Sequence, residues 1–411
     1  MNFEYFIAKR IIDSKAYKSS ISAPIIKIGI VAIAIGIIVM MVAIATGIGL
    51  QQKIRDKVVA FNGHVSIAKY DTNNSEESQT PISINQDFYP KFASVEGIKH
   101  IQVVASKSAI IRKVEDFEYV IVKGVGEDYN WEYFKEYLIE GVLPDYTKPR
   151  NEEVLISEYL ANRLQINVGD KINTYFIKSD INKPPNIISY KVVGIYNSGF
   201  KDFDELYIVG DIRHIKRLNK WKTDEIGNFE VFIEDYDKLD KKGEEIFQNV
   251  PSEYNSMTIT AKYPLVFEWI GIFDKNIYGI IGIMILVAGI NMITALLVLI
   301  LERTQMIGIL KALGTSNLGI RKIFIYNATY LILLGLFWGN LIGLSLLFAQ
   351  KYFGLFPLNP ETYYVSTVPV YINIGYIILL NIGTFILCLL MLLVPSYIIT
   401  RISPVKAIRF E

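Results

Sequence analysis

Residues 302–317, ERTQMIGILKALGTSN, form a short, polar-edged segment between two long apolar runs. Five apolar side chains in it follow the spacing of one stripe on a helix: Met306, Ile307, Ile309, Leu310 and Leu313. Three charged side chains lie off that stripe: Glu302, Arg303 and Lys311. Gly314 can end this helix in a left-handed C-cap, and Thr315 or Ser316 can cap the next helix. The pattern is compatible with an ordinary hairpin between membrane spans or with a helix offered to a cytoplasmic partner.

The composition places two environments in one chain. Of 411 residues, 51% are hydrophobic, which is too apolar for an ordinary soluble enzyme, yet 20% are charged. A net charge of +1 argues against a nucleic-acid-binding protein. The one cysteine, Cys388, lies in an apolar run, and the three histidines lack the spacing of metal ligands. We therefore expect no metal and no cofactor in this chain, and no catalytic motif is present in it.

Four apolar runs are long enough to cross a membrane, and they predict spans at residues 24–50, 271–301, 323–350 and 371–400. Before them, residues 1–23 predict an amphipathic helix on the membrane surface, with Phe3, Phe6, Ile7 and Ile11 on one face. Glycines at 335, 339 and 343 recur every four residues in the third span, which predicts a face for close helix packing.

Residues 51–270 lack a further span and predict a folded, mixed α/β domain between the first and second spans. Alternating patterns indicate strands that include residues 101–113, 117–125 and 257–261, and helices that include residues 131–140 and 157–164. The first spanning helix is expected to continue through residue 61 and the second to begin near Pro264, so that the two form a stalk.

The distribution of Lys and Arg predicts the orientation. Basic residues gather in the N-terminal segment, in the loop 302–322 and in the tail 401–411, whereas the loop 351–370 holds only Lys351. The positive-inside rule places both termini and the 302–322 loop in the cytoplasm, and the α/β domain and the 351–370 loop outside. Because no phosphate-binding motif is present, energy for any mechanical work must come from a partner ATPase.

Three stretches resemble a known family. Residues 302–314, the segment 358–370 beginning LNPETYY, and the tail 401–409, RISPVKAIR, are similar to the lipoprotein-releasing ABC permeases, the LolC/LolE group of the FtsX/MacB superfamily. The resemblance implies an α-helical membrane protein with four transmembrane helices and a MacB-like mechanotransmission architecture. It implies a periplasmic domain in two subdomains, about 51–125 plus 228–265 and 126–227, and identifies residues 302–314 as the coupling helix. Met306 departs from many relatives, which carry an acid there.

The function that the resemblance implies is extraction of lipoproteins from the bacterial inner membrane and their transfer to a periplasmic chaperone. The implied partners are a cytoplasmic ABC ATPase that holds ATP and Mg, and a second permease copy or a sister permease. The segment 178–189 is similar in position to a chaperone-binding loop, although an ordinary hairpin is an equal alternative; its central residues are Asn182, Lys183, Pro184, Pro185 and Asn186.

Acyl chains are expected between the outer halves of the first two spans, although core packing would explain the same side chains. The residues expected there are Met40, Met41, Ile44, Ile48, Ile280, Ile283 and Met284. Three rival functions stay open: an FtsX-like mechanotransmitter that regulates a periplasmic partner such as a cell-wall hydrolase, a MacB-like efflux permease, and an adhesion or receptor protein without an ATPase.

Overall fold

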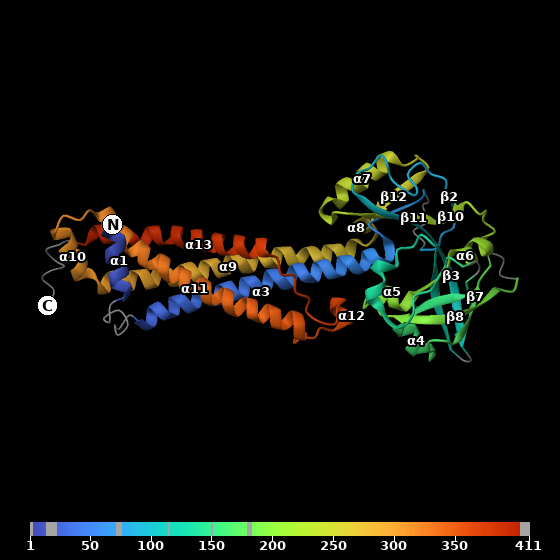
Figure 1. Ribbon diagram of the computed structural model, residues 1–411, viewed down its shortest axis with the longest axis horizontal. Coiled ribbons are helices and arrows are strands. Elements are labelled where there is room, and N and C mark those ends of the chain that lie inside the picture. Colours follow the sequence, from blue (N-terminus) through green and yellow to red (C-terminus); the bar gives the residue numbers. More distant parts are fainter. Residues whose placement is uncertain are drawn as a thin grey trace. The chain divides into compact units, whose positions relative to one another are not determined.

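The structure, a computed structural model, describes residues 3–13, 23–70, 76–113, 116–148, 151–178 and 183–402 (Figure 1). In this part of the chain, four helices are long and apolar enough to cross a membrane, which confirms the prediction. They are α3 (Ala23–Asn62), α9 (Pro264–Glu302), α11 (Asn317–Phe353) and α13 (Ile374–Ser396). The chain divides into two compact units: a helical unit of residues 1–51, 269–357 and 367–411, and an α/β unit of residues 52–268 and 358–366.

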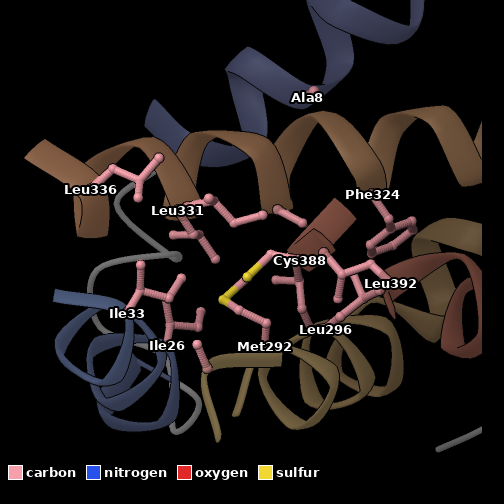
Figure 2. Close-up of a cluster of buried hydrophobic side chains, with 14 of the residues drawn as sticks. Ala8, Ile26, Ile33, Met292, Leu296, Phe324, Leu331, Leu336, Cys388 and Leu392 are labelled. Carbon is pink, nitrogen blue, oxygen red and sulfur yellow. The ribbon is translucent and has the colours of Figure 1, made fainter. Parts of the chain in front are cut away.

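The core of the helical unit lies where its long helices run side by side (Figure 1). Figure 2 shows Ile33 of α3, Met292 of α9, Phe324 of α11 and Cys388 of α13 directed into one cluster. These side chains are all nearly inaccessible. Because lipid is as apolar as the core, the helices are held together by close packing and hydrogen bonds more than by the hydrophobic effect.

The glycine face of the third span packs against α3, as predicted. A Cβ atom built on Gly335 would lie 2.7 Å from the Cβ of Ile33, and one on Gly339 would lie 2.9 Å from the Cβ of Ile37. Such distances are shorter than real contacts, so only glycine allows the two helices to approach this closely.

One pair of polar side chains inside the spans bonds between helices. Asn340 of α11 and Asn381 of α13 exchange two hydrogen bonds of 2.6 and 2.9 Å between their side-chain amides. Asn373 caps α13 by accepting a hydrogen bond from the backbone N–H of Gly375 at 2.7 Å. A short helix, α14 (Ile398–Arg401), follows α13 after Pro395, whose ring disfavours continuation of the helix.

The N-terminal helix α1 (Phe3–Asp13) packs one side against the core of the helical unit. Ala8 and Ile11 are buried in the core of the helical unit, whereas Phe3 and Phe6 are exposed. Tyr5 packs edge-on against Tyr326 of α11, with 5.9 Å between ring centroids. α1 is therefore packed on the third span, and of the predicted face Phe3, Phe6, Ile7 and Ile11 only Ile11 is buried in the protein. That α1 lies on the membrane surface stays a prediction.

The α/β unit is built on one ten-stranded sheet. Its strand order is β12-β1-β11-β3-β4-β9-β6-β8-β5, and β7 pairs with β3 and β8. The bounds are β1 (Val65–Lys69), β3 (Ile98–Lys113), β4 (Asp116–Val125), β5 (Leu138–Gly141), β6 (Glu153–Ser157), β7 (Lys171–Phe176), β8 (Asn186–Tyr196), β9 (Tyr207–Asp211), β11 (Asn228–Ile233) and β12 (Tyr254–Thr258). A separate pair is formed by β2 (Ile82–Ser83) and β10 (Glu225–Ile226).

The strands of the two predicted subdomains occupy separate halves of this sheet. Strands from 51–125 and 228–265 form one half, and those from 126–227 form the other. Two pairs join the halves: the parallel pair β4–β9, in register from Ile121↔Tyr207 to Val125↔Asp211, and the antiparallel pair β3–β7, from Ile110↔Tyr175 to Arg112↔Asn173. Strand interiors are apolar where both faces are covered, as in Val120–Val122 of β4. The unit thus has a continuous sheet.

Short helices join these strands: α4 (Glu158–Leu164), α5 (Lys201–Leu206), α6 (Ile212–Asn219), α7 (Leu239–Asn249) and α8 (Ile259–Lys262). Two predictions were wrong. Residues 131–140 form two 3₁₀ turns and the start of β5 rather than one α-helix. The strand predicted at 257–261 ends at Thr258, whose side chain caps α8 by accepting a hydrogen bond from the N–H of Ala261 at 3.3 Å.

Candidate functional site

The segment 302–317 contains a short helix, α10 (Thr304–Ala312), closed by the glycine that the sequence singles out. Gly314 has a φ of +86°, and its N–H donates to the carbonyl of Lys311 at 3.0 Å. The N–H of Thr315 donates to the carbonyl of Leu310 at 3.0 Å, which completes a Schellman motif. Ser316 then caps α11 by accepting from the N–H of Gly319 at 3.2 Å. Both predicted caps are confirmed, and they fix the chain's entry into α11.

The apolar stripe of α10 does not stay on one surface. Ile307 and Leu310 are buried in the core of the helical unit, and Met306 packs against that core. Ile309 and Leu313 are 48% and 77% exposed. Part of the stripe therefore has a core within the helical unit to cover. Three residues anchor α10, and two are left on the surface.

The charged residues of the segment also differ in role. Glu302, the last residue of α9, is exposed, and Arg303 is half-buried. Lys311 points back into the protein, where its Nζ donates to the carbonyls of Ile399 at 2.8 Å and Ile402 at 2.7 Å. Carbonyls at a helix end lack partners within the helix, so Lys311 fastens α10 to the end of α14.

Two of the residues expected to contact acyl chains are in the protein core instead. Met40 and Met41 have 0% and 2% of their surface exposed. They cannot contact lipid in this arrangement, and the core-packing alternative is correct for them. The other five residues expected there are partly or largely exposed: Ile44, Ile48, Ile280, Ile283 and Met284.

The predicted chaperone loop joins β7 to β8, which pair as an antiparallel hairpin from Lys171↔Lys191 to Phe176↔Asn186. Lys183, Pro184 and Pro185 are exposed, and Asn186 begins β8; Asn182 lies outside the described residues. Two large apolar side chains at the base of the loop are also exposed, Ile177 at 61% and Ile187 at 57%.

The last turns of α3 belong to the α/β unit, and Phe61 in them contacts a buried ion pair that was not predicted from the sequence. Lys123 of β4 and Glu230 of β11 form an ion pair of 2.6 Å, with 5% of each side chain exposed. Lys123 Nζ also donates to the carbonyl of Phe61 in the last turn of α3. Burial lowers the pKa of Lys123, and Glu230 opposes that shift. Removing one partner would leave a buried charge uncompensated, at about 3–5 kcal/mol.

The residues just before α9 contact the same end of α3. Asn62, the last residue of α3, accepts hydrogen bonds of 3.0 Å at its Oδ1 from Lys262 and from the hydroxyl of Tyr263. Lys262 also pairs with Glu76 at 3.0 Å. We call the residues Phe61, Asn62, Lys123, Glu230, Lys262 and Tyr263 the helix junction. It joins the ends of both predicted stalk helices, whose continuation to residue 62 and start at Pro264 are confirmed.

A polar cavity opens beside the helix junction. Its lining includes Ser66, Ser106 and Asn228 of the sheet and two ion pairs, Lys123 with Glu230 and Lys262 with Glu76. Across the described ranges, no group of three His, Cys, Asp or Glu side chains could hold a metal ion.

One signal in the sequence could have located the helix junction. Lys123 interrupts the apolar run YVIVKGV and Glu230 interrupts FEVFI. A charge at the centre of an apolar strand must be paired when it is buried, so these two residues could have been matched as partners.

Comparison with family models places two known domains on the chain. Residues 28–245 match the MacB-like periplasmic core domain, and residues 278–404 match the FtsX-like permease C-terminal model.

Curated relatives include LolC proteins aligned over nearly the whole chain and a permease aligned over about half of it. The chain is 21% identical to the lipoprotein-releasing system transmembrane protein LolC of Neisseria meningitidis, over 100% of both chains. It is 19% identical to the LolC protein of Xylella fastidiosa, over 93% of both. An uncharacterised ABC transporter permease of Methanocaldococcus jannaschii is 27% identical over 46% of this chain and 49% of its own.

Among solved structures, the periplasmic region of MacB from Actinobacillus actinomycetemcomitans is 16% identical, with a TM-score of 0.34, over 51% of this chain and 95% of that one. The extracellular domain of the transporter YknZ from Gram-positive bacteria is 15% identical, with a TM-score of 0.33, over 47% of this chain and 99% of that one.

Proposed function

We propose a transport function for this chain, which belongs to the LolC-type ABC permeases of the FtsX/MacB superfamily. It is the membrane subunit that extracts lipoproteins from the inner membrane and passes them to a periplasmic chaperone. ATP is hydrolysed on a separate cytoplasmic subunit that also holds Mg. Two permease chains, identical or sister, and two ATPases form the working complex, since one four-span chain cannot enclose a path for lipid.

The observation that carries this proposal is the length of the match. LolC of Neisseria meningitidis aligns with the whole chain, so the relation covers the helices, the α/β unit and the segment 302–317 together. The helix junction adds physical support, because two membrane-spanning helices end on one buried network and can carry motion into a sheet.

The proposed docking surface for the ATPase is the exposed part of α10. Ile309 and Leu313 are large exposed apolar side chains on a helix segment whose Ile307 and Leu310 are buried. A groove on a partner would cover them in the way that amphipathic helices are usually recognised. Glu302 and Arg303 flank this surface, and Gly314 fixes the end of the helix.

The test is co-purification of the ATPase with the double variant Ile309→Asp, Leu313→Asp. We expect loss of at least about tenfold in bound ATPase, because two charges would be buried without partners. Leu355→Asp is the matched control, since Leu355 is 57% exposed in the loop between α11 and α13. Leu310→Asp is unsuitable, because Leu310 is buried and its change would unfold the segment. Undiminished co-purification of the double variant would reject the docking surface.

The proposed path for acyl chains uses the exposed residues of the first two spans. Ile44, Ile48, Ile280, Ile283 and Met284 remain candidates, and Met40 and Met41 do not. The decisive measurement is ATP-dependent release of an acylated protein from vesicles that contain this chain and its ATPase. Release must depend on the acyl chains, so a non-acylated membrane-anchored form is the control. Equal release of the two forms, or none, would reject lipoprotein transport.

The proposed chaperone contact is the loop between β7 and β8 with its exposed base. Ile177→Asp with Ile187→Asp is expected to weaken chaperone binding at least about tenfold, because both side chains are more than half exposed and apolar. Phe247→Asp is a matched control, since Phe247 is 51% exposed on α7 of the same unit. Unchanged chaperone binding would reject the proposed contact and favour the alternative of an ordinary hairpin loop.

A second candidate function is favoured by the family models themselves. The matched domains are named for MacB and FtsX, which is compatible with an FtsX-like regulator of a periplasmic partner or a MacB-like efflux permease. Both alternatives keep the ATPase and the coupling surface. The release measurement separates them, since neither requires extraction of an acylated protein.

A further inference from the structure

The loop between α11 and α13 leaves the helical unit and returns to it. Residues 351–357 and 367–373 belong to the helical unit, but Leu358–Ser366 belongs to the α/β unit. We call Leu358–Ser366 the strap. It contains one helical turn, α12 (Pro360–Tyr363), and its two ends are closed by a hydrogen bond of 2.9 Å from the N–H of Leu358 to the carbonyl of Ser366.

The neck of the strap is fixed to the helical unit. Gln350, in the last turn of α11, is 6% exposed and reaches both strands of the neck. Its side-chain amide donates to the carbonyl of Val368 at 2.9 Å and accepts from the N–H of Phe356 at 3.0 Å. After the neck, the N–H of Tyr371 donates to the carbonyl of Ala45 in α3 at 3.0 Å. A movement of α11 would therefore pull directly on the strap.

The tip of the strap is fixed within the α/β unit, to the part of α3 that belongs to that unit. Lys57 Nζ donates to the carbonyl of Tyr364 at 2.7 Å, and Lys57 is 9% exposed. Gly199 leaves room for this bond, since a Cβ there would lie 2.9 Å from Lys57 Nζ. Tyr364 has a φ of +58°, which is unusual for a side chain of its size and is retained only where contacts hold it.

A series of stacked rings makes a second attachment. Tyr364 stacks on Phe200 with 4.6 Å between centroids, Phe200 on Phe203 with 4.7 Å, and Phe203 on Phe61 with 4.8 Å. The series runs from the strap to the last turn of α3, where Phe61 accepts a hydrogen bond from Lys123. The strap thus reaches the helix junction without a break in packing.

We propose that the strap is a second mechanical connection, through which movement of α11 and α13 reaches the α/β unit at Lys57 and Phe200. The connection by α3 and α9 runs through continuous helices, whereas the tip of the strap is held by contacts that include the Lys57 hydrogen bond and the Phe200 ring stack. It sets the position of the end of α3 according to the state of the third and fourth spans. This inference rests on the proposed ATP-driven function, because a transmitting element needs a source of movement.

The experiment uses hydrogen exchange on the full chain with its co-purified ATPase in lipid nanodiscs, with and without ATP. The variants are Lys57→Met, which keeps the stem and removes the donor, and Phe200→Leu, which keeps apolar volume and removes the ring. Lys53→Met is the matched control, because Lys53 lies one turn away on α3 in an exposed ion pair with Glu136. Unchanged exchange in β3 and β8 shows that a variant is folded.

We expect both variants to speed exchange in the strap by about tenfold and to reduce the ATP-dependent change in the α/β unit, with the control like wild type. Unchanged strap exchange would show that these contacts do not hold it. Faster strap exchange with a full ATP-dependent change in the α/β unit would show that the strap transmits nothing, as would the absence of that change in wild type. Failure of lipoprotein release with these exchange results intact would reject the proposed cargo and leave the strap in place.

Discussion

His64 lies where the chain leaves α3 and enters β1, and it makes the α/β unit sensitive to acid. Its Nδ1 accepts a hydrogen bond of 3.2 Å from the N–H of Ile233, so the ring is neutral on that side. Burial, with a smaller effect from the charge of Lys99, lowers the pKa of His64 to about 4. The ring would have to lose this hydrogen bond at Nδ1 in order to be protonated there.

The pH dependence follows from this shift. An unfolded chain binds a proton at His64 near pH 6.5, but the folded chain binds it only near pH 4, so stability falls as the pH is lowered from 6.5 to 4. The loss at His64 is up to about 3 kcal/mol. His64→Gln, which can still accept from Ile233 and does not titrate, should reduce the slope in thermal unfolding of the purified chain between pH 4 and 7. A stability difference between variant and wild type that does not vary with pH would contradict this assignment.

For single residues, the sequence predicted helix caps correctly but did not predict which side chains of α10 are exposed. Gly314 and Ser316 were identified as caps because local backbone needs decide such positions. The division of the α10 stripe into buried Ile307 and exposed Ile309 was not predicted, because it depends on which neighbouring helix covers each side. Lys311 likewise has a partner at α14 that is distant in sequence.

The contact between α11 and α3 depends on glycines in α11, so its contribution to stability can be tested by substitution. Replacing Gly335 and Gly339 together by Ala would force Cβ atoms to within 3 Å of α3. The helices would have to separate, and we expect a loss of about 1–3 kcal/mol in stability. The measurement is thermal unfolding in one detergent.

Gly383 of α13 provides the control for this measurement. A Cβ on Gly383 would meet nothing within 4 Å, so Gly383→Ala should be neutral or slightly stabilising. Equal effects of the α11 and α13 substitutions would mean that helix propensity, rather than close packing, explains the glycines.

The α-helix predicted at 131–140 does not form, because aromatic packing in the folded unit favours two 3₁₀ turns. Trp131, Phe134 and Tyr137 are three residues apart, which matches the repeat of a 3₁₀ helix. Phe134 and Tyr137 both pack on Phe61, with 5.0 and 6.1 Å between ring centroids. The aromatic cluster around the end of α3 therefore determines the local backbone, and only the folded unit brings Phe61 to this place.

For the whole molecule, periodicity and length predicted the four spans and the α/β unit, since each is set by a long stretch of composition. The strap was not predicted as part of the α/β unit. Its residues were noted only as a family motif, because nothing local in 358–366 indicates that Tyr364 stacks on Phe200. Contacts between residues this far apart in sequence need the fold.

Orientation in the membrane is the property of the whole molecule that follows from charge alone. The segment 303–322, which ends in the first turns of α11, carries Arg303, Lys311, Arg321 and Lys322, whereas the segment 351–373, which begins in the last turn of α11, carries only Lys351. Retention of basic loops on the cytoplasmic side therefore predicts that α10 is inside and the α/β unit outside. Single-cysteine reporters can test this, since Cys388 is fully buried and adds little background even before its replacement by Ala.

An impermeant maleimide added to spheroplasts should label Lys69→Cys in the α/β unit and Leu355→Cys after α11, both at exposed positions. Leu313→Cys, which is more exposed than Leu355, should react only after the membrane is opened. The two cysteine variants serve as controls for each other, because exposure alone would make Leu313→Cys react faster than Leu355→Cys. Labelling of Leu313→Cys in closed spheroplasts would place α10 outside, out of reach of any cytoplasmic ATPase, and would remove the physical basis of the coupling proposal.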